Sequence, residues 1–190
     1  KYFSNTPTKI LGTEPRKLED IAKDIDTIGQ LLGTEKTAQA SAKKFRAQVK
    51  HLEQQYNKNI SHTAPVRVFY QIWAQPLMTL NREHLIGDII QLCGGEQLFA
   101  KEKPLVSTIS RESVVKADPE IIFTATDNPN MRTDWSMWSS LPNLSATKNQ
   151  AFVEIDGDTI SRPSPQILLG VEKMCAAIEK VGRSKYRSIN

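Results

Sequence analysis

The sequence predicts an α/β fold: a C-terminal three-layer lobe, with a mainly parallel sheet flanked by helices, preceded by one long helix. Apolar strand patterns alternate with amphipathic helical patterns along the last two-thirds of the chain. That alternation is typical of a parallel sheet covered by helices on both faces. The chain has 190 residues, which is long enough to bury a substantial core.

Composition indicates an ordinary globular protein, with 39% hydrophobic and 24% charged residues and a net charge of +4. The basic residues are scattered and are not interleaved with aromatic residues, so we expect no nucleic-acid interface. No apolar run approaches the length of a membrane-spanning helix. The sequence does not begin with methionine, and we expect a processed or truncated chain.

Two helices are predicted before the sheet. The first follows apolar residues at steps of three and four and ends at Gly33. The second begins after Thr34, a plausible N-cap, and its apolar stripe continues to Tyr56. At 1.5 Å per residue this second helix is about 30 Å long, enough to run the height of a small domain.

The lobe itself is predicted from strands and helices in alternation. Each strand is a short run of β-branched and aromatic residues, and each helix has an apolar stripe or a capping residue. The expected strands are 66–73, 106–109, 120–125 and 151–155, and the expected helices are 85–93, 111–117 and a final helix that begins near Ser164. A loop through Pro76 and Met78, and a helical turn around Trp135 and Trp138, are expected between them.

Charged residues gather between the last strand and the last helix. Asp158 and Arg162 flank Ile160 in a loop, and Ser164 and Pro165 then suit the cap and first position of the helix. Open α/β sheets place ligands at loops that follow strands. Asp158 and Arg162 are therefore either binding groups or an exposed salt bridge that shapes the turn.

Two cysteines, Cys93 and Cys175, each fall on the apolar stripe of a predicted helix. They are either buried free thiols or, in an exported protein, a structural disulfide. They lack the spacing and partner ligands of a metal site, and we expect no metal. The three histidines form no ligand pattern, and no catalytic triad order or phosphate loop occurs.

Three segments, DGDTISRPSPQILLGVEKMC, VFYQIWAQPLMTL and LCGGEQLFA, together resemble the periplasmic vitamin B12-binding proteins of ABC importers. These proteins have two lobes joined by one long helix. The resemblance implies a domain plan in which 1–33 is a remnant of an N-terminal lobe, 34–58 the linking helix, 59–184 the C-terminal lobe and 185–190 a tail. It also implies an exported, periplasmic protein that is not an enzyme.

The resemblance further implies that cobalamin is the transported ligand, with no cofactor, and that it lies in the cleft between the lobes. Asp158 and Arg162 match an acid and an arginine of the family, and would bind the amide arms at the rim of the corrin ring. Trp73 and Met78 would contact the ring face, with Met78 where the family has phenylalanine. Ile160 would also contact the ligand, in a place near which the family has aromatic residues.

Other family features carry over in the same way. Cys93 and Cys175 match a pair that forms a disulfide, and Glu112 matches an acid that pairs with an arginine of the membrane permease. Val106 departs from the family, which has tryptophan there. The residue types alone leave Trp73 open as a core residue, and Glu112 as an acid placed for the helix dipole.

Two alternatives to cobalamin transport stay open. A haem or ferric-siderophore binder would share the fold, although haem would need a tyrosine or histidine ligand and a siderophore more arginines. A small α/β enzyme using Asp158 and Arg162 is the alternative from another class.

Overall fold

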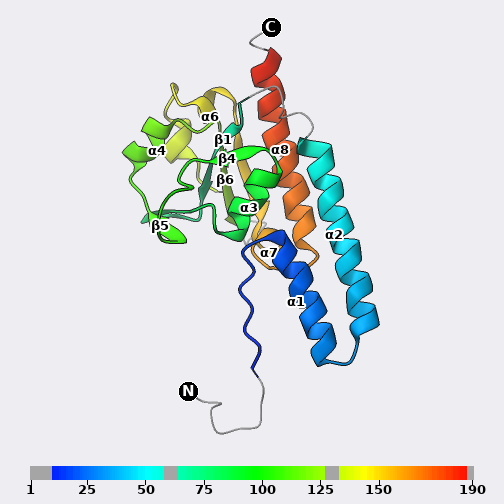
Figure 1. Ribbon diagram of the computed structural model, residues 1–190. Helices are drawn as coiled ribbons and strands as arrows, with labels where there is room; N and C mark the ends of the chain where they lie inside the picture. Colours follow the sequence, from blue (N-terminus) through cyan, green and yellow to red (C-terminus); the bar gives the residue numbers. More distant parts are fainter. Residues whose placement is uncertain (1–9, 58–63, 127–132, 188–190) are drawn as a thin grey trace.

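The computed structural model describes residues 10–57, 64–126 and 133–187 (Figure 1). Two long helices come first, followed by strands and helices in alternation. In chain order the elements are α1 Leu18–Leu31, α2 Glu35–Asn57, β1 Val66–Gln71, β2 Trp73–Ala74, β3 Leu77–Leu80, α3 Leu85–Leu92, β4 Gly95–Gln97, β5 Val106–Thr108, α4 Arg111–Ala117, β6 Ile121–Thr126, α5 Ser136–Ser139, α6 Ser145–Lys148, β7 Phe152–Asp156, α7 Gly157–Ile160 and α8 Ile167–Arg187.

The central sheet is parallel throughout and has the strand order β4-β1-β6-β7. Strand β1 lies between β4 and β6, with Val68 paired to Gln97 on one side and to Ile121 on the other. A second, antiparallel sheet has the order β2-β3-β5. The expected α/β class with a mainly parallel sheet is confirmed.

Helices cover both faces of the central sheet. On one face Val68, Tyr70 and Phe123 pack with α3 and α8, and the α1–α2 pair joins the same core. On the other face Phe69 and Ile122 pack with apolar residues of α4, α5 and α6. Because side chains alternate along a strand, a strand buried on both faces reads as one continuous apolar run.

Helices α1 and α2 form an antiparallel hairpin alongside α8 (Figure 1). Gly33, with φ of +67°, ends the first helix in a conformation that favours glycine. Arg46 of α2 bonds to Glu19 at 2.9 Å and to Asp26 at 3.2 Å, both on α1. The 23-residue α2 matches the long helix predicted from the sequence.

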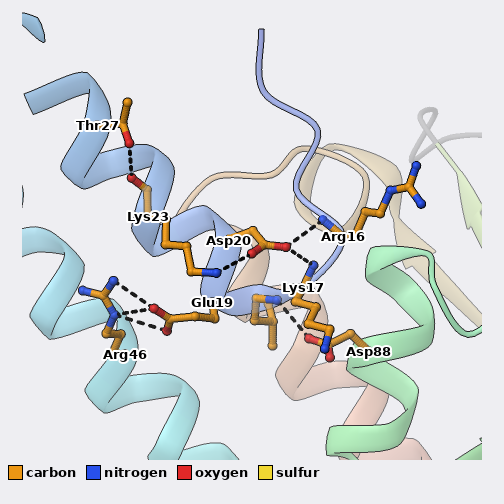
Figure 2. Close-up of polar contacts among 9 residues, drawn as sticks. Arg16, Lys17, Glu19, Asp20, Lys23, Thr27, Arg46 and Asp88 are labelled. Carbon is orange, nitrogen blue, oxygen red and sulfur yellow. Dashed lines mark hydrogen bonds and ion pairs between the residues drawn. The ribbon is translucent and has the colours of Figure 1, made fainter. Parts of the chain in front are cut away.

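The first turn of α1 is capped from another part of the chain (Figure 2). The backbone N–H of Leu18 donates to the Asp88 carboxylate of α3 at 2.9 Å, across 70 residues of sequence. Asp20 accepts from the backbone N–H of Lys17 at 3.0 Å and so satisfies a second amide of the same helix end. Burial raises the pKa of the half-buried Asp88 carboxyl, and the Leu18 N–H and the charge of Lys17 offset this in part.

Asp88→Ala is expected to lower the free energy of unfolding by about 1 kcal/mol, because the Leu18 amide loses its acceptor. Asp88→Asn keeps an oxygen acceptor and removes a charge that is costly to bury, so it is expected to match the wild type within about 0.5 kcal/mol at pH 7. Urea denaturation of the three proteins measures both differences. An equal loss in the two variants would contradict a capping role.

A disulfide joins Cys93, which caps the end of α3, to Cys175 of α8, with an S–S distance of 1.97 Å. Both residues are buried among the apolar side chains of the core. The bond links two helices on one face of the sheet, and the disulfide expected from the resemblance is confirmed.

Several local predictions need correction. The expected loop around Pro76 and Met78 is the β2–β3 hairpin, because a turn at 75–76 lets two short strands pair. Strand β4, α6 and α7 were not predicted, and α8 begins at Ile167, after a turn at 164–166.

The first nine residues and the last three lie outside the described part of the chain, so the expected N-terminal remnant is described only from residue 10. Among the described residues, no helix is both long and apolar enough to cross a membrane.

Candidate ligand-binding site

The order in which strands are added to the sheet reverses between β1 and β6, whose carboxyl ends lie side by side. After β1 the chain passes through α3 to β4 on one side, and after β6 it passes to β7 on the other. Helix α3 covers one face of the sheet, and α5 and α6 cover the opposite face. Open α/β sheets bind ligands in the crevice at the carboxyl ends of two strands between which the strand order reverses.

A buried polar group lies at this point. The Gln71 side-chain oxygen accepts from the Trp138 indole N–H at 2.8 Å, and the Thr124 hydroxyl donates to the Gln71 carbonyl at 2.9 Å. Trp138 is 1% exposed and packs edge-on against Phe69, so the packing interpretation of this residue holds. Sequence reasoning missed Gln71, since its partner Trp138 is 67 residues away.

The β2–β3 hairpin follows β1 directly and carries two of the predicted contact residues. Trp73 pairs with Met78 across the hairpin, so their side chains extend from the same face. The Trp73 side chain is 61% exposed, and its indole N–H donates to the Gln75 carbonyl at 2.9 Å. Met78 is half-buried. The hairpin therefore presents a flat aromatic ring to solvent, with a thioether beside it.

Helix α7 follows β7 at the same edge of the sheet and carries Asp158, and Arg162 lies two residues after its end. Asp156 caps this single turn by accepting from the Asp158 N–H at 2.8 Å, and the Thr159 hydroxyl donates to the Asp156 carbonyl at 2.8 Å. Asp158 and Arg162 form an i,i+4 ion pair in which both side chains are well exposed, by 62% and 71%. The pair can accept and donate hydrogen bonds at once, though in water it adds little stability.

The two segments flank the end of β6. Strands β1 and β7 are separated by β6 alone, so the usual strand spacing puts their ends about 10 Å apart. The hairpin supplies an aromatic face on one side, and α7 and the segment that follows it supply charged groups on the other. Such an arrangement can hold a flat ligand with polar groups at its periphery.

Ile160 does not fit the expected contact set and is a correction. Its side chain is 0% exposed and lies against Gly170 of α8. Because it fills the space between α7 and α8, it offers no surface to a ligand. Val106, where the resemblance implied a larger ring, is half-buried on β5 and pairs with Leu80.

Glu112 lies apart from these residues, in the first turn of α4, and is exposed. Its own backbone N–H, together with the Ser110 hydroxyl, lowers the pKa of the carboxyl. Ser110 caps the helix by accepting from the Ser113 N–H at 3.1 Å. An ionised acid is therefore fixed at the end of a short helix, where a basic partner could reach it.

Comparisons with known proteins agree with this architecture. A family model described as a periplasmic binding protein matches residues 2–159. The vitamin B12-binding protein of Vibrio parahaemolyticus is 29% identical over 97% of this chain and 62% of its own length. That of Vibrio cholerae is 30% identical over 90% of this chain and 59% of its own length. The chain thus spans about 60% of the length of these curated relatives.

Solved structures show the same similarity. The crystal structure of a periplasmic vitamin B12-binding protein of Vibrio cholerae superposes with a TM-score of 0.80 and 28% identity, covering 93% of this chain and 67% of that one. A periplasmic haem-binding protein of Roseiflexus has a TM-score of 0.75 at 14% identity, covering 88% of this chain and 65% of that one. The second similarity concerns the fold alone.

Proposed function

Since the chain belongs to the periplasmic binding protein family, we propose that it is the substrate-binding component of an ABC importer and that its ligand is cobalamin. The protein would bind the vitamin reversibly in the periplasm and deliver it to the membrane permease. Cobalamin is then a transported ligand rather than a cofactor, and no bond is made or broken.

One observation carries this proposal. An exposed aromatic hairpin and an exposed acid–guanidinium pair flank the point where the strand order of the parallel sheet reverses. Trp73 and Met78 would pack against an apolar face of the corrin ring. Asp158 would accept from, and Arg162 donate to, the amide groups at its rim. The similarity to proteins named as vitamin B12-binding favours this ligand over the haem alternative.

The remaining assignments belong to the same proposal. Helix α2 would be the linking helix between two lobes, with 59–184 forming the C-terminal lobe and residues up to 33 belonging to the N-terminal side. Glu112 would pair with a basic residue of the permease. Because α2 is packed against α1, α3 and α8, we expect the two lobes to move only slightly relative to one another.

The test is a calorimetric titration of the complete protein with cyanocobalamin, with hemin as the comparison ligand. We expect cyanocobalamin to bind and hemin not to. Arg162→Ala is expected to weaken cyanocobalamin binding about tenfold or more, because it removes hydrogen bonds made by a charged group.

Arg183→Ala is the matched control. Arg183 forms an exposed i,i+4 pair with Glu179 at 2.6 Å, in the last part of α8. It should leave the affinity unchanged. Hemin binding in place of cobalamin would preserve the fold assignment and reject the ligand, and binding of neither would reject the proposal. Equal losses in the two arginine variants would reject the site.

A further inference from the structure

We propose that the contact between Gly170 of α8 and Ile160 of α7 sets the position of the Asp158–Arg162 pair and so determines ligand affinity. This inference rests on the proposed function. It assigns a positioning role to two buried residues that cannot touch the ligand themselves. Both lie under the polar side of the candidate site.

Helix α7 is held in place by its caps and by the buried side chain of Ile160. The turn is a single one, capped by Asp156, and its carboxyl end is closed by the Ser161 N–H donating to the Gly157 carbonyl at 2.9 Å. Side-chain anchorage comes from Ile160, which is fully buried. Asp158 is two residues before this anchor and Arg162 two residues after it, so both charged groups move when the anchor moves.

Gly170 of α8 lies very close to Ile160 of α7. A Cβ atom there would lie 2.9 Å from the Ile160 Cδ1, 3.1 Å from its Cβ and 3.3 Å from its Cα. The last two atoms are not a flexible side-chain end. They move only with the backbone of α7, so a methyl group at 170 must displace the Cδ1 group and also shift the turn slightly away from α8.

Glycine at 170 is unfavourable for α8 itself, because it lies inside a 21-residue helix, where glycine is less stable than alanine. Gly182 of the same helix lacks such a contact, since a Cβ there would meet only the Val66 Cγ2 at an ordinary 3.5 Å. The two glycines therefore share a helix but differ in what a methyl group would displace.

The experiment compares Gly170→Ala with Gly182→Ala in the complete protein. We expect Gly170→Ala to weaken cyanocobalamin binding about tenfold, the loss that follows when one charge-assisted hydrogen bond is misaligned. Gly182→Ala should change it by less than about twofold. Adding Ile160→Val to Gly170→Ala removes the Cδ1 atom that a new methyl group meets first, and it should restore much of the lost affinity.

Hydrogen exchange of the amides at 157–162 gives a second readout that needs no ligand. Exchange should be faster in Gly170→Ala, unchanged in Gly182→Ala, and slower again in the double variant. If Gly170→Ala does not fold, Ile160→Val alone replaces it, and should also speed exchange in this segment by loosening the same contact.

Different outcomes separate the two proposals. A wild type that does not bind cyanocobalamin, with the expected exchange pattern, rejects the ligand and keeps the positioning contact. A wild type that binds, with Gly170→Ala equal to it in affinity, overturns the positioning role. Affinity lost in Gly170→Ala and not recovered with Ile160→Val also overturns it, because the loss would then arise elsewhere.

Discussion

Replacing Cys93 and Cys175 together by alanine is expected to lower the free energy of unfolding by about 4 kcal/mol. The two residues are 82 apart in sequence, so the bond closes a long loop. In the chain-entropy description, a crosslink of that span removes many conformations from the unfolded chain and leaves the native state unchanged. The variant should keep its fold and unfold at a markedly lower urea concentration.

Urea denaturation with linear extrapolation measures this loss, and the denaturant slope should rise because an uncrosslinked chain exposes more surface when it unfolds. The matched control is the wild type unfolded in the presence of a thiol reductant, which should lose a similar amount. The double variant should not respond to reductant. A loss below about 1 kcal/mol in both proteins would mean that the bond adds no net stability.

Asp118→Ala is expected to cost about 3 kcal/mol of unfolding free energy. Asp118 ends α4 with a positive φ of 48°, which alanine tolerates less well than aspartate. Its carboxylate accepts from the Ser145 N–H at 2.8 Å and the Ser145 hydroxyl at 2.7 Å, and it pairs with Arg67 at 3.0 Å. Alanine would therefore strain the backbone and leave the amide that begins α6 without its acceptor.

Asp118→Asn is the matched control, since asparagine accepts the left-handed conformation and keeps an oxygen for the Ser145 N–H. We expect it to cost about 1 kcal/mol, and equal losses in both variants would contradict the role of the acceptor. Thermal and urea unfolding at pH 7 provide the measurement.

The same carboxylate makes stability depend on pH. Burial tends to raise the pKa of Asp118, but hydrogen bonds from Ser145 and the charges of Arg67 and Lys148 outweigh it and lower the pKa below its ordinary value of 3.8. A carboxyl with a lowered folded pKa contributes stability above its unfolded pKa and loses it as pH falls through the folded one. This contribution should begin to decline as the pH falls below about 4 and be lost once the pH has fallen through the lowered folded pKa, and Asp118→Asn should lack that part of the acid dependence.

Periodic patterns made much of the fold predictable from sequence. Helices α1, α2 and α8 have apolar stripes at helical spacing, and β1 and β6 are short runs buried on both faces, so each pattern reports its own environment. Strand β4 could not be predicted in this way. It begins at Gly95, directly after Gly94, which follows the end of α3, and it is a strand only because β1 supplies its hydrogen-bond partners.

Some residues of the candidate site could likewise be selected from the sequence, and the burial of others could not. Asp158 and Arg162 could be selected because both are charged and lie in a segment that follows a strand, whereas Trp73 was selected through the resemblance. The burial of Ile160 could not, because Gly170 of a different helix decides it. The β2–β3 hairpin was read as a loop because its strands have two and four residues, too few to show alternation.

The three indoles differ sharply in their access to water, and this gives the protein two separate optical signals. Trp73 is 61% exposed at the hairpin, Trp138 is 1% exposed in the core, and Trp135 is half-buried. A collisional quencher such as acrylamide should reach the first and not the second. A ligand resting on Trp73 would shield it from the quencher, whereas the quencher would reach Trp138 only when the core opens. Fluorescence from one unlabelled sample can therefore follow occupancy of the hairpin face and unfolding of the lobe independently.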